Sequence, residues 1–166
     1  MEPPELILTS LENAPAMIIP LVREIPPEVI KRRPRAGKWS AHEHACHLAE
    51  VHSLFFLRLD QMLSEQRPRI RPYDPDRDMP SHDALLQMDL DQALTRFETD
   101  RRKLVDKLRR LPAADWERTA EHPEYSRYSI FIMTRHFALH DLYHAYLIEQ
   151  LMLKRDWEPV TVAEID

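Results

Sequence analysis

The sequence predicts an all-α protein, a four-helix bundle with long connecting loops, and three observations lead to this fold class. The 166 residues include one glycine, Gly37, whereas tight β-hairpins rely on glycine for positive φ angles. The fourteen prolines leave three proline-free stretches, 35–67, 81–111 and 124–158, each long enough for a long helix. No strand-like alternation extends beyond a few residues. The glycine shortage also excludes P-loops and GxGxxG turns.

The N-terminal helix has two alternative boundaries. In the first, Asn13 caps the helix, Pro15 occupies its first position, and the helix continues to Glu24 with a kink at Pro20. In the second, the helix begins near Glu5 and breaks at Pro15.

The helix that follows has a clear start. Ser40 and Glu43 have the spacing of a capping box, in which each side chain satisfies the other residue's backbone amide. Apolar residues then recur at steps of three and four: Leu48, Val51, Phe55, Leu59 and Met62.

Two further helices complete the predicted bundle. One begins at Ser81 and ends before Pro112, and the last begins near Ser129. The last helix has an inward-facing series: Met133, Phe137, His140, His144, Leu147 and Leu151. We expect one domain over 1–166, with loops at 67–80 and 112–128 and a tail at 154–166.

The net charge and the apolar runs indicate which kinds of binding partner to expect. A net charge of −5 argues against a nucleic-acid-coating protein, although basic residues cluster between Lys31 and Lys38. No apolar run approaches the ~20 residues of a membrane span, and the N-terminus lacks the features of a signal peptide. The single cysteine, Cys46, cannot form an intramolecular disulfide. We expect a cytoplasmic protein that binds neither nucleic acid nor membrane.

Histidine is the informative residue type. Seven of the nine histidines fall in the windows 42–52 and 136–144. His140 and His144 occupy predicted core positions four residues apart, a spacing that lets two imidazoles grip one metal ion. His47 borders the apolar face of the preceding helix and is the first candidate for a third ligand, with His44 as its rival. Alternatively, the pair is a hydrogen-bonded part of the core.

The remaining candidates have simpler interpretations. His136 lies at the edge of the inward-facing series and is expected to flank it, and Cys46 is expected to be structural. Asp141 points about 100° away from His140, toward a neighbouring helix. The other histidines are expected to be exposed: His42, His52, His82 and His122.

The pattern Lys38-Trp39-Ser40-x-x-Glu43-x-x-x-His47-Leu48, followed by His140-Asp141-x-x-His144, resembles the DinB-like (YfiT-type) superfamily. The resemblance covers nearly the whole chain and implies a four-helix bundle. It implies that a metal is held by His47, His140 and His144, which selects His47 over His44. It also implies a divalent metal ion, with zinc or nickel expected first.

The resemblance implies several activities: transfer of low-molecular-weight thiols, isomerisation of thiol adducts, or hydrolysis of a small molecule. It also implies a homodimer. Glu43 and Glu50 flank His47 and are weak candidates for a catalytic base, and Glu43 is already accounted for by the capping box. Three hypotheses follow: a metal-dependent transferase or hydrolase, a metal-binding or stress-response protein without turnover, and an interaction module whose histidines are core residues.

Overall fold

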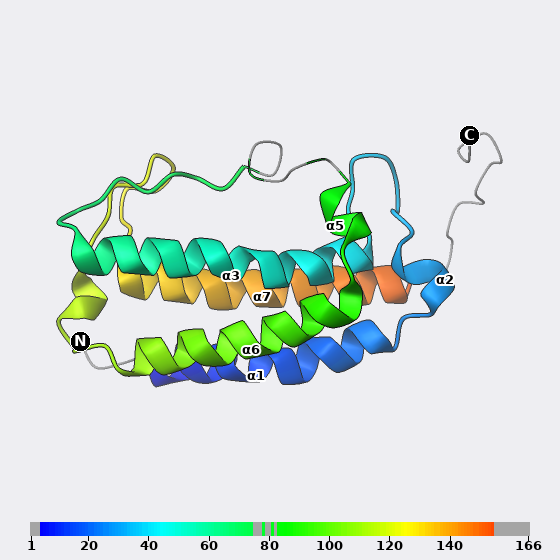
Figure 1. Cartoon of the computed structure of the whole chain (residues 1–166), viewed down its shortest axis with the longest axis horizontal. Coiled ribbons are helices and arrows are strands. Elements are labelled where there is room, and N and C mark those ends of the chain that lie inside the picture. The colour runs from blue at the N-terminus through cyan, green and yellow to red at the C-terminus, as the bar shows by residue number, and fades with distance from the viewer. Residues whose placement is uncertain (1–3, 75–77, 79–80, 82, 155–166) are drawn as a thin grey trace.

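Four long helices form a bundle in the computed structural model, which describes residues 4–74, 78, 81 and 83–154 (Figure 1). They are α1 (Glu5–Arg23), α3 (Ala41–Ser64), α6 (Leu90–Arg109) and α7 (Ile130–Met152). Short helices α2 (Pro27–Ile30), α5 (Ala84–Gln87) and the 3₁₀ turn η1 (Asp115–Glu117) lie in the connections. The described residues form no strand, only two isolated β-bridges. The predicted all-α bundle is confirmed.

The helices run up, down, down and up in chain order. Figure 1 shows α3 and α6 running in the direction opposite to α1 and α7. Helix α3 packs against α7 and α6, and α1 packs against the other sides of α7 and α6, so the four helices form a closed ring. Because α3 and α6 are parallel, the chain between them must return along the whole bundle, which explains the long connection between their ends.

Each alternative for the first helix is correct at one end: the start near Glu5 is confirmed, the end near Glu24 is confirmed to within one residue, and the break at Pro15 and the cap at Asn13 are wrong. The helix starts at Glu5, as in the second alternative, but Pro15 and Pro20 lie inside it and neither breaks it. Asn13 is therefore an interior residue and no cap. A proline removes one helical hydrogen bond, and here the buried face of α1, which packs on α6 and α7, outweighs that loss.

Helix α1 is also the one described helix long and apolar enough to cross a membrane by length and composition alone. The sequence pattern had suggested no such run. Within the bundle, the apolar residues of α1 form part of the core, including Leu8, Leu11, Ile18 and Val22. A core helix of this kind meets the same length and composition test.

The helix expected to begin at Ser81 begins later. Residues Ala84–Gln87 form the separate helix α5, Met88 is extended, and Asp89 caps α6 by accepting a 2.8 Å hydrogen bond from the amide of Gln92. The Asp89 side chain accepts the hydrogen bond that the Gln92 amide would donate to a backbone carbonyl in one continuous helix. A new helix therefore begins here.

The two other predicted starts are confirmed. Ser40 and Glu43 form the capping box of α3, and Ser129 caps α7 through the amide of Ile132. Gly37 lies just before α3 with φ +72°, a conformation that glycine adopts without a Cβ clash.

Two histidines expected to be exposed are buried. His42 and His52 are each about 1% exposed. The expectation assumed that α3 buries a single stripe, but every residue from Ala41 to Ala49 is buried, because α5, α6 and α7 cover this half of α3. His122 is partly buried, and His82 and residues 155–166 of the predicted tail lie outside the described residues.

One buried arginine connects all four long helices. Arg101 of α6 forms an ion pair through two nitrogens with Asp141 of α7, donates to His52 of α3 over 3.1 Å, and donates to the carbonyl of Leu11 of α1 over 3.0 Å. Its guanidinium also lies over the ring of Phe137, 4.5 Å from the centroid. Asp141 thus contacts a neighbouring helix, as its position in the sequence predicts, and it holds the turn of α7 that carries His140.

Candidate metal centre

His47, His140 and His144 converge between α3 and α7. Because these helices are antiparallel, the second turn of α3 lies beside the later half of α7. The Nε2 atom of His140 lies 3.1 Å from Nε2 of His47 and 3.1 Å from Nε2 of His144. One nitrogen from each of the three rings lies within 4.8 Å of the others.

These distances fit a divalent ion. Two ligand nitrogens bound at about 2.05 Å in tetrahedral geometry are about 3.3 Å apart, close to both 3.1 Å separations. The donors are imidazoles alone, which suits zinc, nickel, copper and iron(II). The described residues place no fourth protein ligand in this group, so the set leaves coordination positions for water or substrate.

Burial keeps the three rings neutral, as metal ligation requires. Burial, aided by neighbouring imidazoles, lowers the pKa of His47 to about 3, and burial with His136 and Arg101 lowers that of His140 to about 4. Burial lowers the pKa of His144 further still. At neutral pH each ring therefore has a nitrogen lone pair free of a proton.

His44 contacts the opposite side of the group. Its Nδ1 lies 2.9 Å from Nδ1 of His144. When Nε2 of His144 points at a metal, its Nδ1 carries the proton and donates a hydrogen bond to Nδ1 of His44. Burial lowers the pKa of His44 to about 4, so this ring is neutral and able to accept. The structure therefore places His44 behind His144, while the other candidate, His47, belongs to the converging group.

Trp39 covers the group from the loop before α3. Its ring centroid lies 4.9 Å from that of His47, 5.4 Å from His44 and 6.1 Å from His144. An indole in this position shields the imidazoles from bulk water and limits their rotation.

Two cavities open beside the histidines. The Trp39 cavity, about 520 Å³, includes Trp39, His44, His144 and Tyr143 in its lining. The Arg58 cavity, about 190 Å³, reaches the other side of the group. It is lined by His47, Val51, Leu54, Phe55, Arg58, Pro72, Tyr73, His122, Glu124, Tyr125, Tyr128, His136 and His140. A small molecule in either cavity would contact at least one of the converging histidines.

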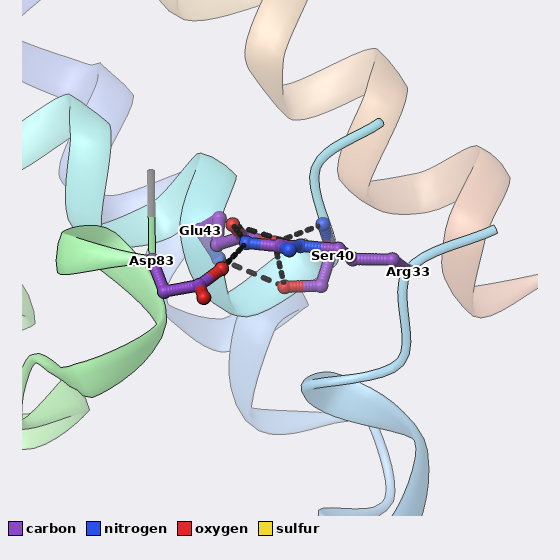
Figure 2. Close-up of polar contacts among 4 residues, drawn as sticks. All are labelled: Arg33, Ser40, Glu43 and Asp83. Atoms are coloured by element: carbon purple, nitrogen blue, oxygen red, sulfur yellow. Dashed lines mark hydrogen bonds and ion pairs between the residues drawn. The ribbon is translucent and has the colours of Figure 1, made fainter. Parts of the chain in front are cut away.

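Glu43 is bound elsewhere. Figure 2 shows its carboxylate beside Ser40, whose amide donates over 2.8 Å, and beside Arg33, whose Nε donates to both oxygens at 3.0 and 3.1 Å. Arg33 also bridges to Asp83. Burial opposes ionisation of Glu43, but Arg33 and Ser40 outweigh it and lower the pKa of the carboxyl group. Glu43 thus anchors the start of α3 and lines neither cavity.

Three other predicted residues also lie apart from the converging nitrogens. Glu50 forms an ion pair with Arg96 of α6. Cys46 is fully buried, and burial raises its thiol pKa to about 12, as expected for a structural cysteine. His136 is exposed and lines the Arg58 cavity without joining the three ligand candidates.

The pattern of the sequence did not reveal Arg58 or Tyr73. One signal was available for Arg58: it follows His47 by eleven residues, about three helical turns, and so shares its face of α3. Tyr73 comes from the long connection after α3, whose path no periodicity predicts.

Neutral, buried or half-buried imidazoles that converge between antiparallel helices, with cavities beside them, make this a helical bundle with a candidate histidine metal site. The sequence comparison makes this more specific. The family model of the DinB superfamily matches residues 10–148, and the chain belongs to that superfamily.

Known relatives agree with this class. The chain is 28% identical over 150 residues to a protein of Oceanobacillus iheyensis named "Putative metal-dependent hydrolase", covering 90% of this chain and 86% of the relative. A Bacillus cereus protein of the same name is 23% identical with the same coverage. The structure of YfiT from Bacillus subtilis, described as a probable metal-dependent hydrolase with an unusual four-helix bundle topology, superposes with a TM-score of 0.81. It is 22% identical, and the match covers 93% of this chain and 88% of that one, which shows the shared fold. The relatives and the histidine group together support a metal cofactor.

Proposed function

We propose that this protein is a metal-dependent enzyme in which His47, His140 and His144 hold one divalent ion and a small molecule reacts beside it. The convergence of three neutral imidazole nitrogens, with no fourth protein ligand among the described residues, carries this proposal. A structural site is usually closed by four protein ligands, whereas a catalytic site keeps a position open. A divalent ion here supplies Lewis acidity to a bound substrate.

Hydrolysis is the reaction class that the relatives' names favour. Transfer of a low-molecular-weight thiol onto an electrophile uses the same donor set, because zinc and nickel both bind thiolates. The chain contributes the surroundings: Trp39 shields the site from bulk water, and His44 accepts a hydrogen bond from Nδ1 of His144. The small volume of the Arg58 cavity favours a small substrate in either reaction.

Zinc or nickel is the ion we propose. The first test is metal analysis of protein purified without a histidine tag, after saturation with zinc or nickel and gel filtration. We expect one equivalent per chain in the wild type and none in His140→Ala/His144→Ala. His136→Ala, an exposed histidine one turn before His140, is the matched control and should keep the metal. A folded wild type that binds no metal contradicts the proposal.

Turnover distinguishes the enzyme from a protein that only binds metal. The loaded protein is screened against small esters and amides, and against thiols paired with electrophilic acceptors. Activity that disappears in His47→Ala supports the enzyme. Activity that is unchanged in this variant, or no activity in the whole screen, favours the non-catalytic alternative.

A homodimer and a cytoplasmic location complete the proposal. Large apolar side chains are exposed on one side of α7: Leu139, Leu142, Tyr143 and Tyr146 are between 46% and 59% exposed. A second copy would cover this face. Sedimentation of the wild type and of Leu142→Arg tests it: the wild type should sediment as a dimer and the variant as a monomer, whereas a monomeric wild type excludes the dimer.

A further inference from the structure

Arg58 is a buried cation in the wall of the Arg58 cavity. It is 8% exposed, and its guanidinium donates to two neutral oxygens, the carbonyl of Arg71 at 2.8 Å and the hydroxyl of Tyr128 at 3.4 Å. Its buried Nε has no hydrogen-bond partner. Among the described residues, no carboxylate lies within ion-pair distance of Arg58, although a buried charge is costly unless it is paired.

The groups around Arg58 leave its charge largely uncompensated. His122 and His136 line the same cavity, and burial and the charge of Arg58 lower the pKa of each, which favours the neutral rings. Glu124 is the carboxylate of this lining, and it is exposed, so water screens it. The cavity therefore presents one buried positive charge.

A second buried polar atom in the same lining also has no partner. The hydroxyl of Tyr73 is buried and makes no hydrogen bond, while its ring lies 5.5 Å from that of His47. Buried polar groups in native proteins are almost always satisfied. Arg58 Nε and Tyr73 Oη thus belong to one cavity lining, together with two further unsatisfied atoms, Nδ1 of His47 and Nδ1 of His140.

The placement of Arg58 suits a ligand that extends from the histidines. Arg58 lies about 16 Å along α3 from His47 on the same face, and helical side chains lean toward the N-terminus, here toward His47. Val51 and Leu54 form the apolar wall between them. A volume of about 190 Å³ corresponds to roughly six water-sized groups, which is the size of a short-chain molecule.

We propose that Arg58 binds the carboxylate of a small substrate whose reacting group lies at His47 and His140, and that Tyr73 shares this contact. The free Nε edge of a guanidinium donates to carboxylate oxygens in a fixed fork geometry. A carboxylate carries the single negative charge that balances Arg58. This inference rests on the proposed function, since it names the substrate class of the same site.

The test uses ligands that carry the metal-binding thiol, the carboxylate, or both. The probe is 3-mercaptopropionate, whose thiol suits a metal and whose carboxylate suits Arg58. 3-Mercaptopropanol lacks the carboxylate, and propionate lacks the thiol. Binding is measured by calorimetry on the zinc-loaded protein for the wild type, Arg58→Met and Arg118→Met. Arg118 is the matched control, because it donates to the carbonyls of Met62 and Glu65 but lies outside this cavity.

We expect Arg58→Met to weaken 3-mercaptopropionate at least tenfold and to leave 3-mercaptopropanol unchanged, because a hydrogen bond to a charged group is lost. Arg118→Met should affect neither ligand. Equal binding of the two thiols, or equal loss of both in Arg58→Met, overturns the inference.

A second measurement does not depend on the variant's folding or on metal. In wild-type protein, the ¹⁵N–¹H signal of Arg58 Nε should shift on titration with propionate, with or without zinc, and should not shift with propanol. If propionate shifts this signal but the protein never binds zinc, the proposed function fails and the carboxylate site stands. If zinc binds and propionate leaves the signal unmoved, the carboxylate site fails and the metal function stands.

Discussion

We predict that His44 raises the metal affinity of the proposed site through its hydrogen bond with His144. The perturbation that tests this is His44→Leu, which removes the acceptor 2.9 Å from Nδ1 of His144. The His144 N–H is then a buried donor without a partner. The tautomer with the proton on Nε2 becomes more favourable, and in that tautomer Nε2 cannot bind the metal.

The expected loss follows from this single hydrogen bond. Removing a group that orients a ligand histidine lowers metal affinity by about 10- to 100-fold, equal to about 1.4–2.7 kcal/mol. The zinc dissociation constant is measured at pH 7 by competition with a chromophoric chelator. Stoichiometry should remain one, because His47, His140 and His144 are intact.

The matched control is His42→Leu. His42 is also buried on α3, half a turn earlier, and it lines neither cavity. It should bind zinc as tightly as the wild type. A His44→Leu affinity within about threefold of His42→Leu would refute the reasoning, because the hydrogen bond would then contribute nothing to ligand orientation.

Three further predictions concern stability and reactivity. Asp141→Asn should lower the free energy of unfolding, measured in urea, by about 3–5 kcal/mol, because Arg101 is left charged and buried without its partner. The double variant Arg101→Met/Asp141→Leu should recover most of this loss. A loss below about 1 kcal/mol in the single variant contradicts the prediction. Glu43→Gln should lower the free energy of unfolding by about 1.5–3 kcal/mol at pH 7, because its hydrogen bonds to Arg33 are weaker. The folded-state pKa of Glu43 lies below its unfolded value, so this difference is complete above the unfolded pKa and disappears as the pH falls through the folded one; a difference independent of pH would be contrary to it. Cys46, with its pKa raised to about 12, should resist iodoacetamide at pH 8 until the protein is unfolded, and rapid native labelling would show that the thiol is accessible.

Much of the fold was predictable because its signals are local. Ser40 and Ser129 cap their helices through residues three positions away, and such contacts depend on sequence spacing alone. The same local rules misjudged α1, since Pro15 and Pro20 are tolerated only because tertiary packing holds that helix together. They also misjudged Ser81, because the cap at Asp89 competes with it.

The candidate site divides in the same way. The four-residue spacing of His140 and His144 places both rings on one side of a helix in any fold, so this pair was readable from the sequence. The third position was ambiguous between His44 and His47 by helical geometry alone, and the family resemblance selected His47. Arg58 and Tyr73 could not be assigned, because their shared cavity exists only once the connection after α3 folds back along the bundle.

The sequence by itself therefore determined the four-helix architecture, the caps at Ser40 and Ser129 and a histidine pair, and the caps and the pair arise from interactions within about one helical turn. The tertiary structure alone decided that α3 runs antiparallel to α7, which brings His47 to within 3.1 Å of His140 and puts His44 behind His144. It also decided that Arg101 and Arg58 are buried, one paired with Asp141 and the other facing a cavity. Burial and pairing are properties of chain segments that meet across 40 to 100 residues, and no short-range pattern encodes where those segments meet.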